Sequence, residues 1–184
     1  MDKPILYDQY RITGKWSPKI NYVLLLKDRS FRKVYYIRKL QESSGILYNI
    51  YHILNYLLRK KMSLENSRKT KIGKGIKIIH PYSITINGKC KIGDNFTILK
   101  GATIGESKTG KIGAPVIGNN VYVGLNSTVV GGISVGNNVM IAANTFVNFD
   151  VPDDSLVLGS PGVIKSKEKA SKDYITNSIS TIGK

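Results

Sequence analysis

Residues 117–147 read IGNNVYVGLNSTVVGGISVGNNVMIAANTFV, and an aliphatic side chain returns at every sixth position along them. The members of this series are Ile117, Val123, Val129, Val135, Ile141 and Val147. A single strand repeats every two residues and a helix every 3.6, so neither element explains the spacing. A period of six indicates a coil that repeats around a narrow axis.

The same series runs through the preceding part of the chain. Its earlier members are Ile72, Ile78, Ile86, Ile92, Ile98 and Ile104, and a second row of small or apolar residues lies two positions before most of them, as at Cys90 and Ala102. Glycine or asparagine follows many members of the series, and both tolerate the positive φ of a tight corner. The pattern predicts a mainly β fold, a left-handed parallel β-helix (hexapeptide solenoid) over residues 71–164.

The first 70 residues have a different character. They contain 15 Lys and Arg but only 5 Asp and Glu, and they predict helices over residues 20–40 and from Ile46 to about Lys61. The second helix is amphipathic, so two interpretations stay open. It packs on the solenoid or on a sister subunit, or it lies on a membrane surface as an interfacial helix with peripheral contact. Residues 165–184 form a polar C-terminal tail, expected to be mobile or wrapped over the surface.

Composition narrows the classes of function. The formal net charge of +16 suggests an anionic partner. The lysines of the repeat are isolated at corners without interleaved aromatic residues, so we expect no nucleic-acid partner. The single Cys90 sits in an inward position and forms no disulfide framework, which fits a reducing compartment. With no long apolar segment near the start, we expect a cytoplasmic protein, with the inner membrane face as its site of peripheral contact.

Two breaks in the repeat mark where chemistry is expected. Ile78 and Ile86 are eight residues apart, and the extra pair accompanies His80-Pro81-Tyr82. Ile104 and Ile117 are thirteen apart, which predicts a protruding loop over residues 105–116. Its GESKTGK stretch resembles a phosphate-binding loop, but Ile112 replaces the required hydroxyl and no helix follows. Two histidines in the whole chain are too few for a three-histidine zinc site, so no metal is expected.

These residues resemble the hexapeptide-repeat acyltransferases, most closely the serine acetyltransferase-like branch of surface-polysaccharide O-acetyltransferase type. The matching stretches, within residues 71–164, are KIGKGIKIIHPYSITING, KIGDNFTILKGATIGE, the segment from APVIGNN to NTFV, and DVPDDSLVLGSPGVI. By this resemblance, His80 takes the place of the catalytic histidine, and Glu65 takes the place of an aspartate that orients it.

The resemblance also implies the co-substrate and the assembly. Acetyl-CoA is expected as co-substrate, with backbone N–H groups around Gly105 and Glu106 at the thioester. The pantetheine arm is expected past Leu125 and Ala143, and Lys165 or Lys167 near the phosphates. The family is trimeric with sites between subunits, so we expect a homotrimer.

The chain departs from serine acetyltransferases at the positions that hold an amino acid. Ile79 stands where the family has an aspartate, and Gly113-Ala114 stands where it has an Arg-His pair. We therefore expect an acetyl-CoA-dependent O-acetyltransferase acting on a sugar hydroxyl of capsule, exopolysaccharide or lipopolysaccharide, a glycan acceptor held by residues such as Tyr82. The alternatives are a serine O-acetyltransferase of cysteine biosynthesis, transfer of another acyl group, and a non-catalytic hexapeptide scaffold protein.

Overall fold

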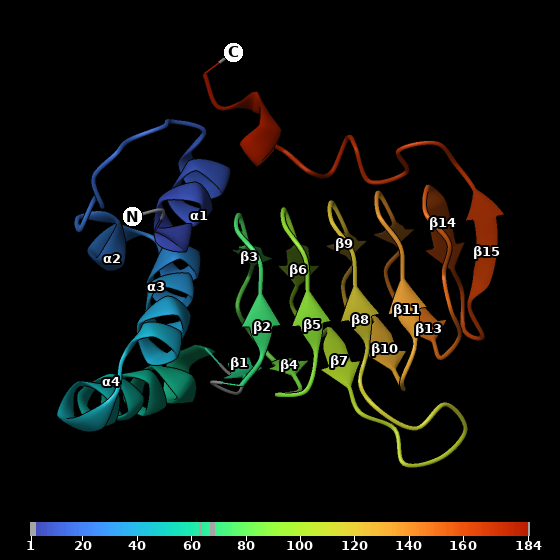
Figure 1. Ribbon diagram of the computed structural model, residues 1–184, viewed down its shortest axis with the longest axis horizontal. Helices are drawn as coiled ribbons and strands as arrows, with labels where there is room; N and C mark the ends of the chain where they lie inside the picture. The colour runs from blue at the N-terminus through green and yellow to red at the C-terminus, as the bar shows by residue number, and fades with distance from the viewer. Residues whose placement is uncertain (1–2, 63, 67–68, 184) are drawn as a thin grey trace.

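The chain winds into a triangular prism with a group of helices at one end (Figure 1). The computed structural model describes residues 3–62, 64–66 and 69–183; for 58–62 and 64–66 it describes the backbone only. Consecutive strands from β1 to β13 go to three sheets in turn, and β14 joins the same sheet as β12. All pairings in the sheets are parallel except that of β14 with β15. This is the left-handed parallel β-helix that the sequence predicts.

Each sheet forms one face of the prism. Sheet A contains β1 (Leu64–Asn66), β4 (Ile84–Ile86), β7 (Thr103–Gly105), β10 (Thr128–Val130) and β13 (Phe146–Val147). Sheet B contains β2 (Lys71–Ile72), β5 (Lys91–Ile92), β8 (Val116–Ile117) and β11 (Ser134–Val135). Sheet C contains β3 (Lys77–Ile79), β6 (Thr97–Leu99), β9 (Tyr122–Val123), β12 (Met140–Ile141), β14 (Ser155–Leu158) and β15 (Val163–Ser166).

The core is the inward row that the sequence indicates. In sheet C, Ile78, Ile98 and Val123 are in register and buried, and Ile141 and Val157 continue the row. Other members of the six-residue series are buried in sheets A and B, with Ile72 in the first coil only partly buried. Burial of one such aliphatic side chain typically contributes about 1.5–3 kcal/mol.

Asparagine ladders hold the corners. Asn120 and Asn138 adopt φ of 54° and 56°, a left-handed conformation that asparagine tolerates. Asn95 donates to Asn120, Asn120 to Asn138, and Asn138 to Asp154, over 2.9, 2.9 and 3.1 Å. Successive coils are therefore tied to one another by side chains as well as by the sheets.

Helices cover the first-coil end of the prism. They are α1 (Pro4–Thr13), α2 (Leu24–Lys27), α3 (Arg29–Glu42) and α4 (Gly45–Met62), and a short 3₁₀ helix, Ile179–Thr181, lies near α1. The helix predicted over residues 20–40 is divided at Asp28, whose side chain accepts a hydrogen bond from the Phe31 N–H and caps α3. Asp8 of α1 forms a buried ion pair with Arg38 of α3 and accepts from the Ile76 N–H of the first coil. None of the described helices is long and apolar enough to cross a membrane.

The ends of the solenoid differ in detail from the expected boundaries. Strand β1 pairs with β4 from Leu64 onward, so sheet A begins ahead of residue 71. After β15, the tail runs back along the prism to α1 (Figure 1). Ala170 and Ile175 are buried along this path, and the Thr176 carbonyl accepts a hydrogen bond from Arg11.

Candidate active site

His80 occupies the enlarged corner between sheets C and A. Strand β3 ends at Ile79, and β4 begins at Ile84. His80 and Ser83 both have positive φ, 53° and 52°, and the Tyr82 N–H donates to the His80 carbonyl over 2.7 Å. His80 is exposed, while the neighbouring Pro81 is buried. The two extra residues thus turn the imidazole out of the coil onto the edge of the prism.

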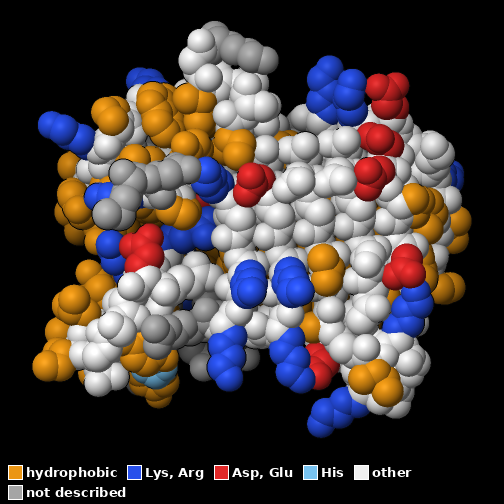
Figure 2. Space-filling view, viewed as in Figure 1, with side chains coloured by type: hydrophobic (Ala, Val, Ile, Leu, Met, Phe, Trp, Pro, Cys, Tyr) orange, Lys and Arg blue, Asp and Glu red, His pale blue; other side chains and the backbone are white. Residues whose placement is uncertain are grey.

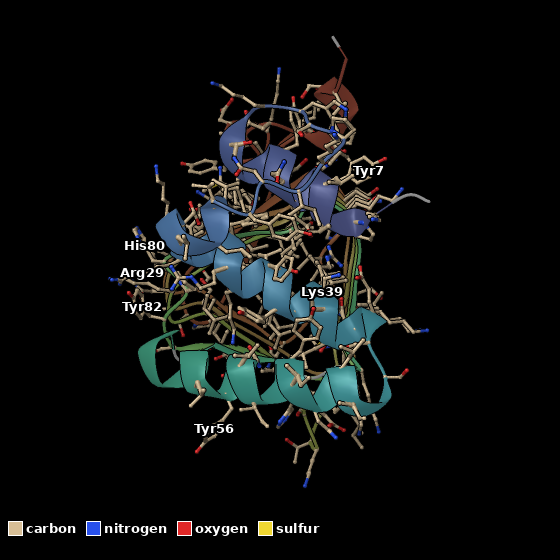
Figure 3. The ribbon with its side chains drawn as sticks, turned by 90° about the vertical axis from the view of Figure 1, so that its left-hand side faces the viewer. Tyr7, Arg29, Lys39, Tyr56, His80 and Tyr82 are labelled. Atoms are coloured by element: carbon tan, nitrogen blue, oxygen red, sulfur yellow. The ribbon has the colours of Figure 1, made fainter. Side chains whose placement is uncertain are left out.

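Arg29 reaches the same corner from the helical region. It is the first residue of α3, and its Nη1 donates a hydrogen bond to the Tyr82 hydroxyl. Figure 3 shows His80, Arg29 and Tyr82 beside one another at one edge of the molecule. No motif or repeat in the sequence singles out Arg29, because only the packing of α3 brings this position beside residue 80. The basic composition of the segment was the one available signal.

Leu125 and Ala143 lie farther along the edge that carries His80. Leu125 is in the corner between β9 and β10, and Ala143 in the corner between β12 and β13. The corners are stacked through backbone hydrogen bonds, from Gly101 to Tyr82, from Asn126 to Lys100 and from Asn144 to Leu125, over 2.8–3.1 Å. One continuous edge therefore offers an extended track beginning at the histidine.

The protruding loop leaves the prism at a different edge. It follows β7 and precedes β8, so it lies between sheets A and B (Figure 1). Ser107 and Gly113 exchange backbone hydrogen bonds of 2.9 and 3.0 Å that close the loop, and Lys111 pairs with Asp150 of a later coil. At its base, Glu106 pairs with Lys89 at 2.6 Å, and hydrogen bonding to that ammonium group holds the pKa of Glu106 below its ordinary value. Contacts with the solenoid therefore fix both the base and the far side of the loop.

A groove of about 480 Å³ lies beneath this loop. Its lining residues are Ser107, Thr109, Gly110, Lys111, Val130, Gly131, Phe146 and Asn148, from the loop and from two coils of sheet A. The groove combines an apolar floor with hydroxyl and ammonium groups. Such a surface suits a ligand that has both apolar and polar groups.

The predicted site residues are not all brought together within one chain. His80 precedes a strand of sheet A, whereas Gly105 and Glu106 lie where a strand of that sheet ends. His80 therefore lies near the starts of the strands of sheet A, and Gly105 and Glu106 lie near their ends. A strand of three residues is about 10 Å long, so at least this length separates the two parts.

Two further predicted residues lie elsewhere. Lys165 is on β15, paired with Leu156 on sheet C. The backbone of Glu65 pairs with Thr85 in sheet A, and its side chain lies outside the described residues. No cluster of three metal-binding side chains occurs among the residues that the structure describes.

Comparison with known proteins finds serine acetyltransferases among the relatives of this chain. A serine acetyltransferase of Helicobacter pylori is 37% identical over 125 residues, which are 66% of this chain and 72% of that protein. A serine acetyltransferase of Staphylococcus aureus is 42% identical over 101 residues, 53% of this chain and 46% of the relative. The chain thus spans about half the length of the staphylococcal protein. No family model matches the chain.

Solved structures agree with these relatives. Neisseria gonorrhoeae serine acetyltransferase in complex with serine is 27% identical, with a TM-score of 0.70 over 89% of this chain and 68% of that one. Brucella abortus serine acetyltransferase in complex with coenzyme A has a TM-score of 0.73 and 20% identity, covering 89% and 67% of the two chains, and supports the fold alone.

Proposed function

Because this chain belongs to the serine acetyltransferase family of hexapeptide-repeat acyltransferases, we propose that it transfers the acetyl group of acetyl-CoA to a hydroxyl with His80 as general base. The match to 72% of the Helicobacter pylori protein carries this proposal. The exposed histidine at the enlarged corner supplies a group suited to the chemistry, since imidazole is the side chain whose ordinary charge change falls near neutral pH.

The reaction needs one proton to move twice. The imidazole of His80 accepts the proton of the acceptor hydroxyl as its oxygen attacks the thioester carbonyl. The tetrahedral intermediate then collapses, the carbon–sulfur bond breaks, and the imidazolium returns the proton to the departing thiolate. The products are the acetyl ester and free CoA. Backbone N–H groups around Gly105 and Glu106 would stabilise the oxyanion.

Sites of this kind would form between two copies of the chain. The His80 edge and the loop edge flank sheet A, so neighbouring copies in a trimer would place one copy's loop beside another copy's histidine. The pantetheine arm would follow the edge past Leu125 and Ala143, and Lys165 would lie near the CoA phosphates.

L-serine is the acceptor that we put first. The names of the relatives support it, and so does Arg29 beside His80. A guanidinium has five N–H donors, and the hydrogen bond to Tyr82 uses one of them. The remaining donors suit the carboxylate of an amino acid whose hydroxyl reaches His80.

A sugar hydroxyl is the second candidate. The apolar Ile79 precedes His80, and Gly113-Ala114 of the loop carries no charged group. An amino acid's ammonium group would find no counter-charge in any of these three residues, and a neutral sugar needs none. Tyr82 would then hydrogen-bond the sugar.

The test is release of CoA thiol by the purified full chain with acetyl-CoA and each acceptor. We expect kcat/KM for L-serine on the order of 10⁴ M⁻¹s⁻¹ or more, and His80→Ala to lower turnover about a hundredfold with the oligomeric mass unchanged. A lipid-linked or oligomeric sugar that reacts faster than L-serine would assign the acceptor to the second candidate. Turnover that does not depend on His80 would refute the mechanism, and no turnover with any acceptor would favour the scaffold alternative.

A further inference from the structure

Helix α4 packs against the rest of the chain through its more polar side. The Tyr51 ring lies 6.3 Å from the ring of Tyr36 on α3. The Asn55 side chain accepts a hydrogen bond of 2.8 Å from Nζ of Lys33, a fully buried lysine of α3. Tyr51 and Asn55 are four positions apart and so share one face of the helix. This inward face supplies the side-chain carbonyl of Asn55 and the ring of Tyr51.

The opposite face of α4 is aliphatic and turned to solvent. Six residues on one stripe are between 37% and 80% exposed: Ile46, Leu47, Ile50, Ile53, Leu54 and Leu57. Figure 2 shows hydrophobic side chains gathered at the end of the molecule that carries the helices, and Figure 3 shows Tyr56 pointing away from α3. The usual polarity of a surface helix is therefore reversed.

Leaving such a stripe in water is unfavourable, at roughly 25 cal/mol for each Å² of apolar surface. A contiguous exposed apolar surface marks an interaction site in a soluble protein. The occupant must therefore be apolar where it meets the stripe, and its charge must suit the surroundings of the helix.

The charge around α4 distinguishes the candidate occupants. The helix contains no Asp or Glu, and its sequence ends with Arg59-Lys60-Lys61 before Met62. The first 70 residues as a whole contain 15 basic and 5 acidic residues. A second copy docked face to face would bring two regions of like charge together. A layer of anionic headgroups would instead have the complementary charge, at about 1 kcal/mol per basic residue near the surface.

We propose that α4 lies in the interface of an anionic phospholipid bilayer, with its aliphatic stripe among the acyl chains. At 1.5 Å per residue its 18 residues extend about 27 Å along the surface. An interfacial helix combines a polar face, an apolar face and terminal basic residues, as α4 does. In this orientation the inward face of α4 still holds α3, so the solenoid stays above the bilayer.

The experiment measures flotation of the full chain with vesicles. Phosphatidylglycerol–phosphatidylethanolamine vesicles are compared with phosphatidylcholine vesicles at low and high salt. The variant I50S/L54S removes two exposed side chains of the stripe without changing charge. The variant N49S/H52S is the matched control, since both positions are exposed on the same helix but outside the stripe. Thermal melts check that both variants fold, and light scattering gives their oligomeric mass.

We expect the wild type and N49S/H52S to float with the anionic vesicles, less so at high salt. Binding by I50S/L54S should be about tenfold weaker or more, because two aliphatic side chains that would enter the acyl-chain region are lost. Absence of wild-type binding to anionic vesicles would overturn the proposal, as would equal binding by the two variants. A lower oligomeric mass of I50S/L54S together with no vesicle binding would assign the stripe to a second copy of the chain.

Discussion

Replacing Arg29 by alanine should weaken the use of L-serine without disabling the chemistry. The guanidinium lies beside His80 and is anchored by its hydrogen bond to the Tyr82 hydroxyl. A hydrogen bond between charged groups contributes about 1.5–3 kcal/mol, and the exposure of Arg29 favours the lower end because water screens the charge. The expected loss is therefore about tenfold in kcat/KM. Because the carboxylate is remote from the reacting hydroxyl, most of the loss should lie in KM.

The assay compares two acceptors in a cycle. Wild type and Arg29→Ala are each measured with L-serine and with L-serinamide, which has the same hydroxyl but no carboxylate. The substitution should cost about tenfold with L-serine and little with the amide. Arg29→Lys should be intermediate, since it keeps the charge but not the planar fork. Lys27→Ala is the control, an exposed cation of α2 two positions earlier.

Two results would refute this reasoning. An equal loss with serine and with serinamide would mean that Arg29 acts by holding Tyr82 and the His80 corner, not by binding a carboxylate. An unchanged kcat/KM for serine would remove Arg29 from the acceptor site altogether. Tyr82→Phe separates the two roles, because it removes the anchor and leaves the guanidinium in place.

Three further predictions concern the solenoid. Val129→Asp should unfold the solenoid because it buries an unpaired carboxylate at a position with 0% exposure. Thr128→Asp, at the neighbouring outward-facing position, should shift the midpoint of thermal unfolding little. Equal shifts of the midpoint in the two variants would refute the inward register of Val129. Burial raises the pKa of the Cys90 thiol to about 11, so the stability gained by burying the neutral thiol persists at lower pH and is lost as pH rises through that value. At pH 8 a disulfide reagent should label Cys90 only as fast as the protein unfolds. Immediate labelling would contradict this. Gly101→Ala should destabilise the fold by about 1–3 kcal/mol, because φ at Gly101 is 75° and a Cβ there would stand 2.0 Å from Asn126 Oδ1. The double variant G101A/N126G should recover part of the lost stability in a denaturant titration. No recovery would exclude the clash as the cause.

The sequence predicts the prism well because its determinants are local and repeated. Each coil must place an aliphatic side chain inward and a residue tolerant of positive φ at the corner, so one register error would conflict with every other coil. Ile98 and Val123, from successive coils, are accordingly buried in one row. The enlarged corner at His80 and the loop after β7 are visible for the same reason, as interruptions of a strict period.

The helical region is less predictable because its contacts join distant parts of the chain. Asp8 meets Arg38 and the backbone of Ile76, 68 residues away in sequence, and no period indicates that meeting. Amphipathicity correctly predicts that α4 has two faces, but it does not decide which face packs. Lys33 and Tyr36 of α3 select the polar face, and that choice leaves the aliphatic stripe in solvent.

The candidate site combines both kinds of information, which is why the position of His80 could be predicted and that of its neighbour Arg29 could not. His80 belongs to the repeat, so its place on the prism edge follows from counting residues. Arg29 belongs to α3, whose end is placed beside Tyr82 only after the helices dock on the first coil. Under our proposal, recognition of an amino-acid carboxylate depends on Arg29, which lies outside the repeat, whereas Ile79 and Gly113-Ala114 belong to the solenoid and its loop. The serine and sugar alternatives therefore differ in whether the exposed guanidinium of Arg29 has a carboxylate to bind, and the comparison of L-serine with L-serinamide tests this difference directly.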